Sequence, residues 1–171
     1  MLMQPNKRTC LLALLVFLSL GLAASAEIKV GDSFPDLAAY KIEGTLPELA
    51  KGKVVMIDFW ASWCGPCAQS FPVMEELQKT YGPQGLVIIA VSVDEKKADL
   101  EDFAKKHPVT FAIVRDVKQK LVAKAGISAM PSSFLIGKDG KVAFTHSGFH
   151  GSATKKQYES EIQSLLKSEA K

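Results

Sequence analysis

Two cysteines separated by two residues, Cys64 and Cys67, are the side chains of this sequence best suited to chemistry. They lie in the segment Trp63-Cys64-Gly65-Pro66-Cys67, in which Pro66 suits the first turn of a helix. Cysteines at positions i and i+3 of a helix start share one face and can close a small disulfide ring. The helix dipole and the free backbone N–H groups at that end stabilise a thiolate. The spacing therefore indicates thiol–disulfide exchange, in which a thiolate is the attacking species.

The place of each cysteine in such a helix predicts its role. Cys64 is expected near the N-cap, where its thiolate can attack a substrate disulfide. Cys67 lies one turn further in, so it is expected to be better shielded and to resolve the mixed disulfide.

Two other uses of the cysteine pair have less support. A zinc site would need two further Cys or His ligands at suitable spacing, and the three histidines, His107, His146 and His150, lie far along the chain. A purely structural disulfide would stabilise little, because so short a loop hardly restricts the unfolded chain.

Asp58 is the second chemical candidate, because it interrupts the apolar run 54–60 directly before the cysteines. Burying an ionised carboxylate is costly, so we expect the pKa of Asp58 to be raised. The functional interpretation is a proton acceptor for Cys67 that works through water. The alternative is a solvated carboxylate at the end or edge of a strand.

The elements that must position these residues alternate between strand and helix, as in an α/β layered domain. Apolar, β-branched runs predict strands at 54–60, 86–93 and 110–114, and a hairpin of 133–136 with 142–147 around an Asp-Gly turn. Helical spacing predicts helices at 66–81, 96–107, 117–125 and 155–167. Pro72 is expected to kink the first of these helices. The stretch 31–52 is expected to be irregular, with a short strand or two.

The N-terminus has the features of a secretory signal peptide. Lys7 and Arg8 precede an apolar run of 14 residues at 11–24, and the small residues 24–26 follow it. We expect cleavage after Ala26, which leaves one domain at 27–171. The alternative is an uncleaved anchor, although the run is shorter than the roughly 20 residues of a membrane span.

The composition excludes several classes of protein. Charged residues make up 23% of the 171 residues, too many for a polytopic membrane protein. The net charge of +3 falls to +1 without Lys7 and Arg8, which gives no support for nucleic-acid binding. Removal of Cys10 with the signal peptide leaves two of the three cysteines, too few for a disulfide-built scaffold.

Two segments resemble the thioredoxin superfamily. The run 55–67 looks like the active-site region of thioredoxins, and 128–136, with Met130-Pro131, is similar to the family's second motif. The signal peptide, the segment 31–36 and the extended middle around 91–94 resemble the exported TlpA/ResA-like branch. The resemblance implies a thioredoxin-like three-layer fold over 27–171: a mixed central β-sheet flanked by helices, with an N-terminal extension and a central insertion.

The resemblance also implies how a substrate is held. Pro131 is expected to be cis, to face the cysteines and to shape the docking groove. Because proline lacks an N–H, the backbone of Met130 is left free to pair with a substrate backbone. Trp63 is expected to be an exposed contact surface beside the sulfurs. Gly65 and Pro66 between the cysteines, as in thioredoxin, suggest a reducing poise.

One position departs from the branch. In many TlpA/ResA-like proteins an acidic residue follows the second cysteine by three positions, and here that position is Ser70. The thioredoxin-type acid, Asp58, is present instead. The combination favours a broader reductase over one dedicated to cytochrome maturation.

These features predict an exported, periplasmic and monomeric thiol–disulfide oxidoreductase with no cofactor or metal beyond the Cys64–Cys67 redox disulfide. The resemblance implies a membrane thiol carrier as electron donor and protein disulfides as substrates, such as those of apocytochrome c or copper-site cysteines. No nucleic-acid partner and no membrane span after cleavage are expected.

Three alternatives remain open. A disulfide oxidase would share every residue named. A copper metallochaperone would use both thiolates with a third ligand such as His146 or His150, although such histidines are expected to be solvated. A peroxidase of the peroxiredoxin type would need a threonine three residues before its cysteine, where Ala61 stands.

Overall fold

The structure, a computed structural model, describes residues 27–48 and 52–168. The signal peptide expected at 1–26 lies outside these residues. Within the described ranges, no helix has the length and the apolar character that crossing a membrane requires.

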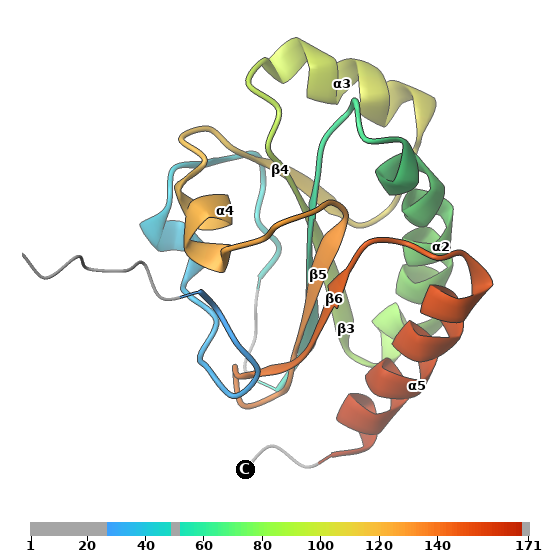
Figure 1. Cartoon of the computed structure of the whole chain (residues 1–171). Helices are drawn as coiled ribbons and strands as arrows, with labels where there is room; N and C mark the ends of the chain where they lie inside the picture. Colours follow the sequence, from blue (N-terminus) through green and yellow to red (C-terminus); the bar gives the residue numbers. More distant parts are fainter. Residues whose placement is uncertain (1–26, 49–51, 169–171) are drawn as a thin grey trace, which may run out of the picture.

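Six strands form one mixed sheet in the order β1-β4-β3-β2-β5-β6 (Figure 1). The strands β2, β3 and β4 are parallel to one another, whereas β1, β5 and β6 each run antiparallel to a neighbour. Their bounds are Ile42–Glu43 (β1), Val54–Trp60 (β2), Leu86–Ser92 (β3), Ala112–Asp116 (β4), Ser132–Ile136 (β5) and Val142–Ser147 (β6). The mixed sheet and the hairpin of β5 with β6 are confirmed.

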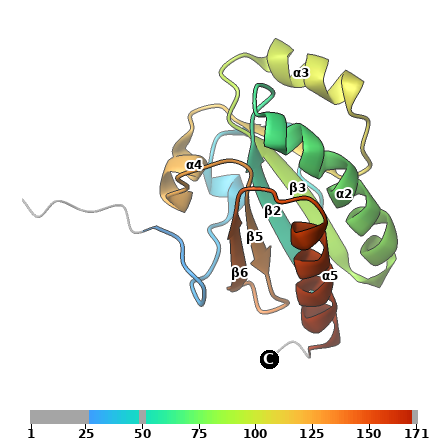
Figure 2. The same cartoon turned by 45° about the vertical axis from the view of Figure 1, so that its right-hand side comes forward.

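Helices cover both faces of the sheet, which gives the three layers expected of a thioredoxin-like fold (Figure 2). One face carries the helices α2, α3 and α5, and the other carries α4 and the N-terminal segment. Their bounds are Gly65–Tyr81 (α2), Lys97–Lys106 (α3), Lys120–Ala125 (α4) and Ser152–Lys167 (α5), with the short 3₁₀ turns Leu37–Ala39 (η1) and Gly82–Gln84 (η2). The helix α2 continues through Pro72.

The central strand β2 is buried along its whole length. Its alternate side chains divide between two cores, as the two-residue period of a strand requires. Val54, Met56 and Trp60 pack under α2, α3 and α5, whereas Val55, Ile57 and Phe59 pack on the opposite face. Residue 58 therefore points to the same face as the helix that carries the cysteines.

The starts of three elements differ from the sequence-based expectation by two residues or more. The strand β4 begins at Ala112 rather than at residue 110, because both Thr110 N and Thr110 Oγ1 donate to the carboxylate of Glu75 on α2. The helix α4 begins at Lys120 rather than at 117, because Gln119 takes a left-handed conformation with φ of 51°. The helix α5 begins at Ser152, directly after Gly151, rather than at residue 155.

An aromatic cluster fastens α3 to α2 and the sheet. The ring centroid of Phe71 lies 4.7 Å from that of Trp60, 4.9 Å from that of Phe103 and 5.5 Å from that of Phe111. Phe71 is completely buried. Such aromatic pairs add stability beyond the apolar area that they bury.

Replacing Phe71 with alanine is expected to lower the free energy of unfolding by about 3–5 kcal/mol, because it removes a buried ring from the centre of this cluster. Urea unfolding of the oxidised protein measures the loss. Val30→Ala is the control, since Val30 is 60% exposed and its truncation should change stability by less than about 0.5 kcal/mol. Equal losses in the two variants would contradict the prediction.

Candidate active site

The cysteine pair lies where β2 leads into α2. Cys64 is the N-cap residue of α2, and its Sγ accepts a hydrogen bond from Cys67 N at 3.2 Å. The two cysteines form a disulfide. Cys64 is 7% exposed and Cys67 is 0% exposed, so the expected difference in shielding is confirmed. Pro66 lies in the first turn of the helix, as expected.

The loop before Cys64 is held by Asp94, which sequence reasoning did not assign to the site. Ser62 N donates to both carboxylate oxygens of Asp94 at 3.1 Å, and Ser62 Oγ donates to Oδ1 at 2.9 Å. A second hydroxyl, Ser92 Oγ, donates to Oδ2 at 2.7 Å. The parallel pairing of Trp60 with Ser92 brings the ends of β2 and β3 to one edge of the sheet. An acid just after the second of two parallel strands was the available signal.

Asp58 is buried, with 1% of its surface exposed. Its Oδ1 accepts a hydrogen bond of 2.6 Å from Ser133 Oγ, and its Oδ2 has no hydrogen-bond partner among the described residues. Burial raises the pKa of Asp58 to about 7, and the bond from Ser133 lowers it in part. The expected rise is confirmed, and the alternative of a solvated carboxylate is wrong. A group with this pKa can take up and release a proton near neutral pH.

The two tryptophans differ in exposure, and Trp63 is exposed as expected. Trp60 is completely buried, and Trp63 is 72% exposed beside the cysteines. A groove of about 490 Å³ begins at Trp63, Cys64 and Gly65 and reaches Phe103 and His107 at the end of α3. Cys64 therefore borders a surface groove, next to the exposed side chain of Trp63.

The segment before β5 contains the expected cis bond, between Met130 and Pro131. The Pro131 carbonyl accepts from Gly148 N at 2.7 Å, which joins this segment to the end of β6. Met130 packs against the buried cluster that contains both cysteines. In the ranges that the structure covers, no hydrogen bond occupies the N–H or the carbonyl of Met130, as pairing with a substrate strand would require.

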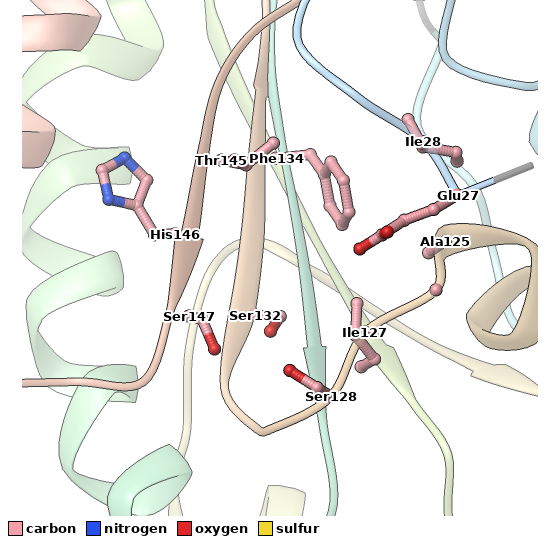
Figure 3. A pocket seen from close by; sticks show the side chains of 11 residues that line it. Glu27, Ile28, Ala125, Ile127, Ser128, Ser132, Phe134, Thr145, His146 and Ser147 are labelled. Atoms are coloured by element: carbon pink, nitrogen blue, oxygen red, sulfur yellow. The ribbon is translucent and has the colours of Figure 1, made fainter.

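A smaller depression of about 170 Å³ lies on the other side of this segment, between β5, β6 and the N-terminal residues Glu27 and Ile28 (Figure 3). Its labelled side chains gather around the depression, except His146, which points away from it.

The expectation that His146 is solvated is wrong. Its Nε2 lies 2.6 Å from a carboxylate oxygen of Glu161, and its ring packs edge-on against Tyr158 with a centroid distance of 4.8 Å.

No cluster of three or more His, Cys, Asp or Glu side chains in the described part of the chain is arranged to hold a metal ion. The redox-active group of this site is the Cys64–Cys67 disulfide itself.

Comparison with known proteins identifies the family. The Redoxin family profile matches residues 29–162. The chain belongs to the Redoxin family. It is 36% identical over 140 residues to the thiol-disulfide oxidoreductase ResA of Geobacillus thermodenitrificans, which covers 81% of this chain and 79% of the relative. The ResA-like resemblance is thus confirmed, and this Redoxin-family protein is a thiol–disulfide oxidoreductase.

Solved structures agree with this Redoxin-family fold. A crystal structure described as a thiol:disulfide interchange protein DsbE from Chlorobium tepidum is 37% identical and has a TM-score of 0.73. It covers 82% of this chain and 99% of that chain. StoA from Bacillus subtilis is 27% identical with a TM-score of 0.56, and it covers 65% of this chain and 85% of that chain.

Replacing Asp58 with asparagine is expected to stabilise the oxidised protein at alkaline pH. The folded-state pKa of Asp58, about 7, lies above the unfolded value of about 3.9, so folding favours the protonated form. The cost of ionisation is absent below about pH 4, grows as the pH rises toward 7 and is complete above it. The difference of about three pKa units between the folded and unfolded states corresponds to about 4 kcal/mol of unfolding free energy.

Urea unfolding of the native chain and of Asp58→Asn at about pH 4 and pH 8 measures this effect. The difference in unfolding free energy between the two proteins should become more favourable to the variant by up to about 4 kcal/mol at the higher pH. Asp36→Asn is the control for the loss of one carboxylate, because Asp36 is exposed and lies outside the buried face that holds Asp58. A constant difference for Asp58→Asn would contradict a raised pKa.

Proposed function

We propose that this protein reduces disulfide bonds in exported proteins through a dithiol–disulfide cycle of Cys64 and Cys67. The single observation that carries the proposal is the disulfide at the N-terminus of α2, with Cys64 at the N-cap and Cys67 behind it. The helix end stabilises a thiolate at Cys64. Asp58 supplies a proton acceptor on the same face of the sheet.

In the proposed reaction, the Cys64 thiolate attacks one sulfur of the substrate disulfide. A mixed disulfide forms, and the other substrate sulfur leaves as a thiolate. Cys67 then loses its proton to Asp58 and attacks Cys64 Sγ, which closes the Cys64–Cys67 disulfide and releases the second substrate thiolate. Two electrons pass from the enzyme dithiol to the substrate, and the protons end on the substrate thiols.

The substrate would lie along two surfaces that meet at Cys64. Trp63 offers an exposed aromatic face, and Gly65 and Pro66 leave the first turn of α2 unobstructed. The free backbone groups of Met130, fixed before cis-Pro131, can pair with an extended peptide. These contacts recognise backbone more than sequence, which fits a reductase with several protein substrates.

The sequence and the family support a direction and a location for the proposed reaction. Gly65-Pro66 between the cysteines resembles thioredoxin, and the motif lacks the histidine that stabilises the reduced form of strong oxidants. We place the protein in the periplasm as a monomer, with a signal peptide cleaved after Ala26. A membrane thiol carrier would re-reduce it, and cysteines of apocytochrome c or of copper sites are candidate substrates.

A measured reduction potential tests the direction. Equilibration with mixtures of reduced and oxidised dithiothreitol, read from the alkylated fraction of Cys64 and Cys67, should give about −230 mV or lower, in the range of reducing dithiols. A value near −120 mV, about that of a strong oxidant, would replace the reductase with a disulfide oxidase.

A trapping experiment tests the exchange step and names the substrate. Cys67→Ala removes the resolving thiol, so the mixed disulfide on Cys64 should persist and be identified by mass spectrometry after non-reducing purification from cells. Cys64→Ala is the matched control and should capture at least about tenfold less, because Cys67 is shielded. Equal capture by the two variants would contradict Cys64 as the nucleophile.

A further inference from the structure

A row of polar side chains crosses the apolar face of the sheet beneath α5. The register pairs Asp58 on β2 with Ser133 on β5, and Ser133 with His146 on β6. All three lie on the face that the buried Tyr158 of α5 covers. Tyr158 OH is 2.8 Å from Ser133 Oγ, and its ring meets the edge of His146. Neither Ser133 nor Tyr158 has a role in the reaction described above.

The hydrogen bonds of this row all point in one direction, toward Asp58. An ionised Asp58 can only accept, so the single hydrogen of Ser133 Oγ is committed to Asp58 Oδ1 at 2.6 Å. The bond between Ser133 and Tyr158 must then be donated by Tyr158 OH. Burial and the charge of Asp58 raise the pKa of Tyr158, so the phenol keeps this proton across the working range of pH.

The two carboxylate oxygens of Asp58 have different surroundings. Oδ1 is occupied by Ser133, and Oδ2 is buried without a partner among the described residues. An unpaired buried acceptor is costly to keep ionised. Oδ2 is therefore the oxygen of this carboxylate on which a proton would settle.

We infer that Ser133 and Tyr158 are positioning residues for the proton acceptor: they fix the Asp58 carboxylate through Oδ1 and leave Oδ2 to receive and return the Cys67 proton. The inference rests on the proposed function, because it needs Asp58 to act as the acceptor in exchange. The donated bonds stabilise the carboxylate over the acid, so they set the pH above which the acceptor works.

The titratable groups around the row come from four elements. Besides Asp58 itself on β2, they are Cys67 on α2, His146 on β6, and Tyr158 and Glu161 on α5. His146 and Glu161 pair with each other at 2.6 Å, and the ring of His146 holds Tyr158 at its edge. This pair packs against the end of the row that lies on β6.

The first test needs no substrate. Carbon-13 NMR follows the titration of the Asp58 carboxyl in the oxidised protein, with Asp58→Asn assigning the signal. Ser133→Ala should raise the midpoint by about one pH unit or more, because it removes a hydrogen bond to the charged form. Tyr158→Phe should raise it by less, and Ser133→Thr, which retains the hydroxyl, should restore the native midpoint.

The matched control is Tyr81→Phe. Tyr81 is also a buried tyrosine, but its hydroxyl accepts from Gln163 and takes no part in the row. Its variant should titrate like the native chain. A Ser133→Ala midpoint equal to the native one, or a Tyr81→Phe shift as large as that of Tyr158→Phe, would overturn the inference. If Ser133→Ala does not fold, the Asp58 midpoint of Tyr158→Phe is compared with that of Tyr81→Phe, and this difference tests the inference.

The second test measures the resolving step. The reduced protein is mixed with the glutathione mixed disulfide of a model peptide, and decay of the enzyme–peptide adduct is followed from about pH 5 to pH 9. Ser133→Ala should be about tenfold slower at pH 6 and equal to the native protein at pH 9, because its acceptor titrates higher. A loss that is constant with pH would indicate a merely structural role and would overturn the inference.

The outcomes of the two tests distinguish a failure of this inference from a failure of the proposed function. An NMR shift without a matching shift in the rate profile would overturn the proton transfer assigned to Asp58, and with it this inference, while exchange by the cysteines would stand. A native protein that resolves no adduct at any pH would contradict the proposed function itself.

Discussion

The burial of one carboxylate is the constraint on which the active site depends. Asp58 lies in a strand that is buried along its whole length, on the face covered by α2 and α5, where an ionised group is strongly disfavoured. Among the residues that the structure describes, one hydroxyl donates to it and its second oxygen has no partner. A carboxyl group held in this way changes its charge near neutral pH, as the proposed deprotonation of Cys67 requires.

The central strand also fixes where the sulfurs lie. Because β2 is covered on both faces and paired on both edges, its carboxyl end is a rigid point from which the chain turns into α2. Asp94 ties that turn to the end of β3 through Ser62. The N-cap position of Cys64 follows from this geometry, and so does the difference in exposure between the two cysteines. Rigid elements hold the two sulfurs, whereas the side chain of Trp63 is exposed and the backbone of Met130 has no hydrogen bond within the described ranges.

A feature can be predicted from the sequence when the residues that cause it lie close together along the chain. Cys64, Cys67 and Pro66 are neighbours, so helix capping and spacing were enough to predict their arrangement. The strand 54–60 was predicted with its observed bounds because its apolar run is continuous. The start of β4 was predicted wrongly, because Thr110 bonds to Glu75, 35 residues earlier, and leaves the sheet.

The sequence by itself determined the redox chemistry, the layered α/β architecture and the identity of the buried acid, since each depends on residue type and local period. Only the tertiary structure decided what surrounds that acid. Ser133 is 75 residues from Asp58, and Tyr158 is a further 25 residues away, so their hydrogen bonds exist only because β5 pairs with β2 and α5 packs on top. His146 looks like an ordinary solvated histidine in the sequence, but its side chain is only 9% exposed for the same reason. Strand register and helix packing are properties of the whole chain, and no local pattern encodes them.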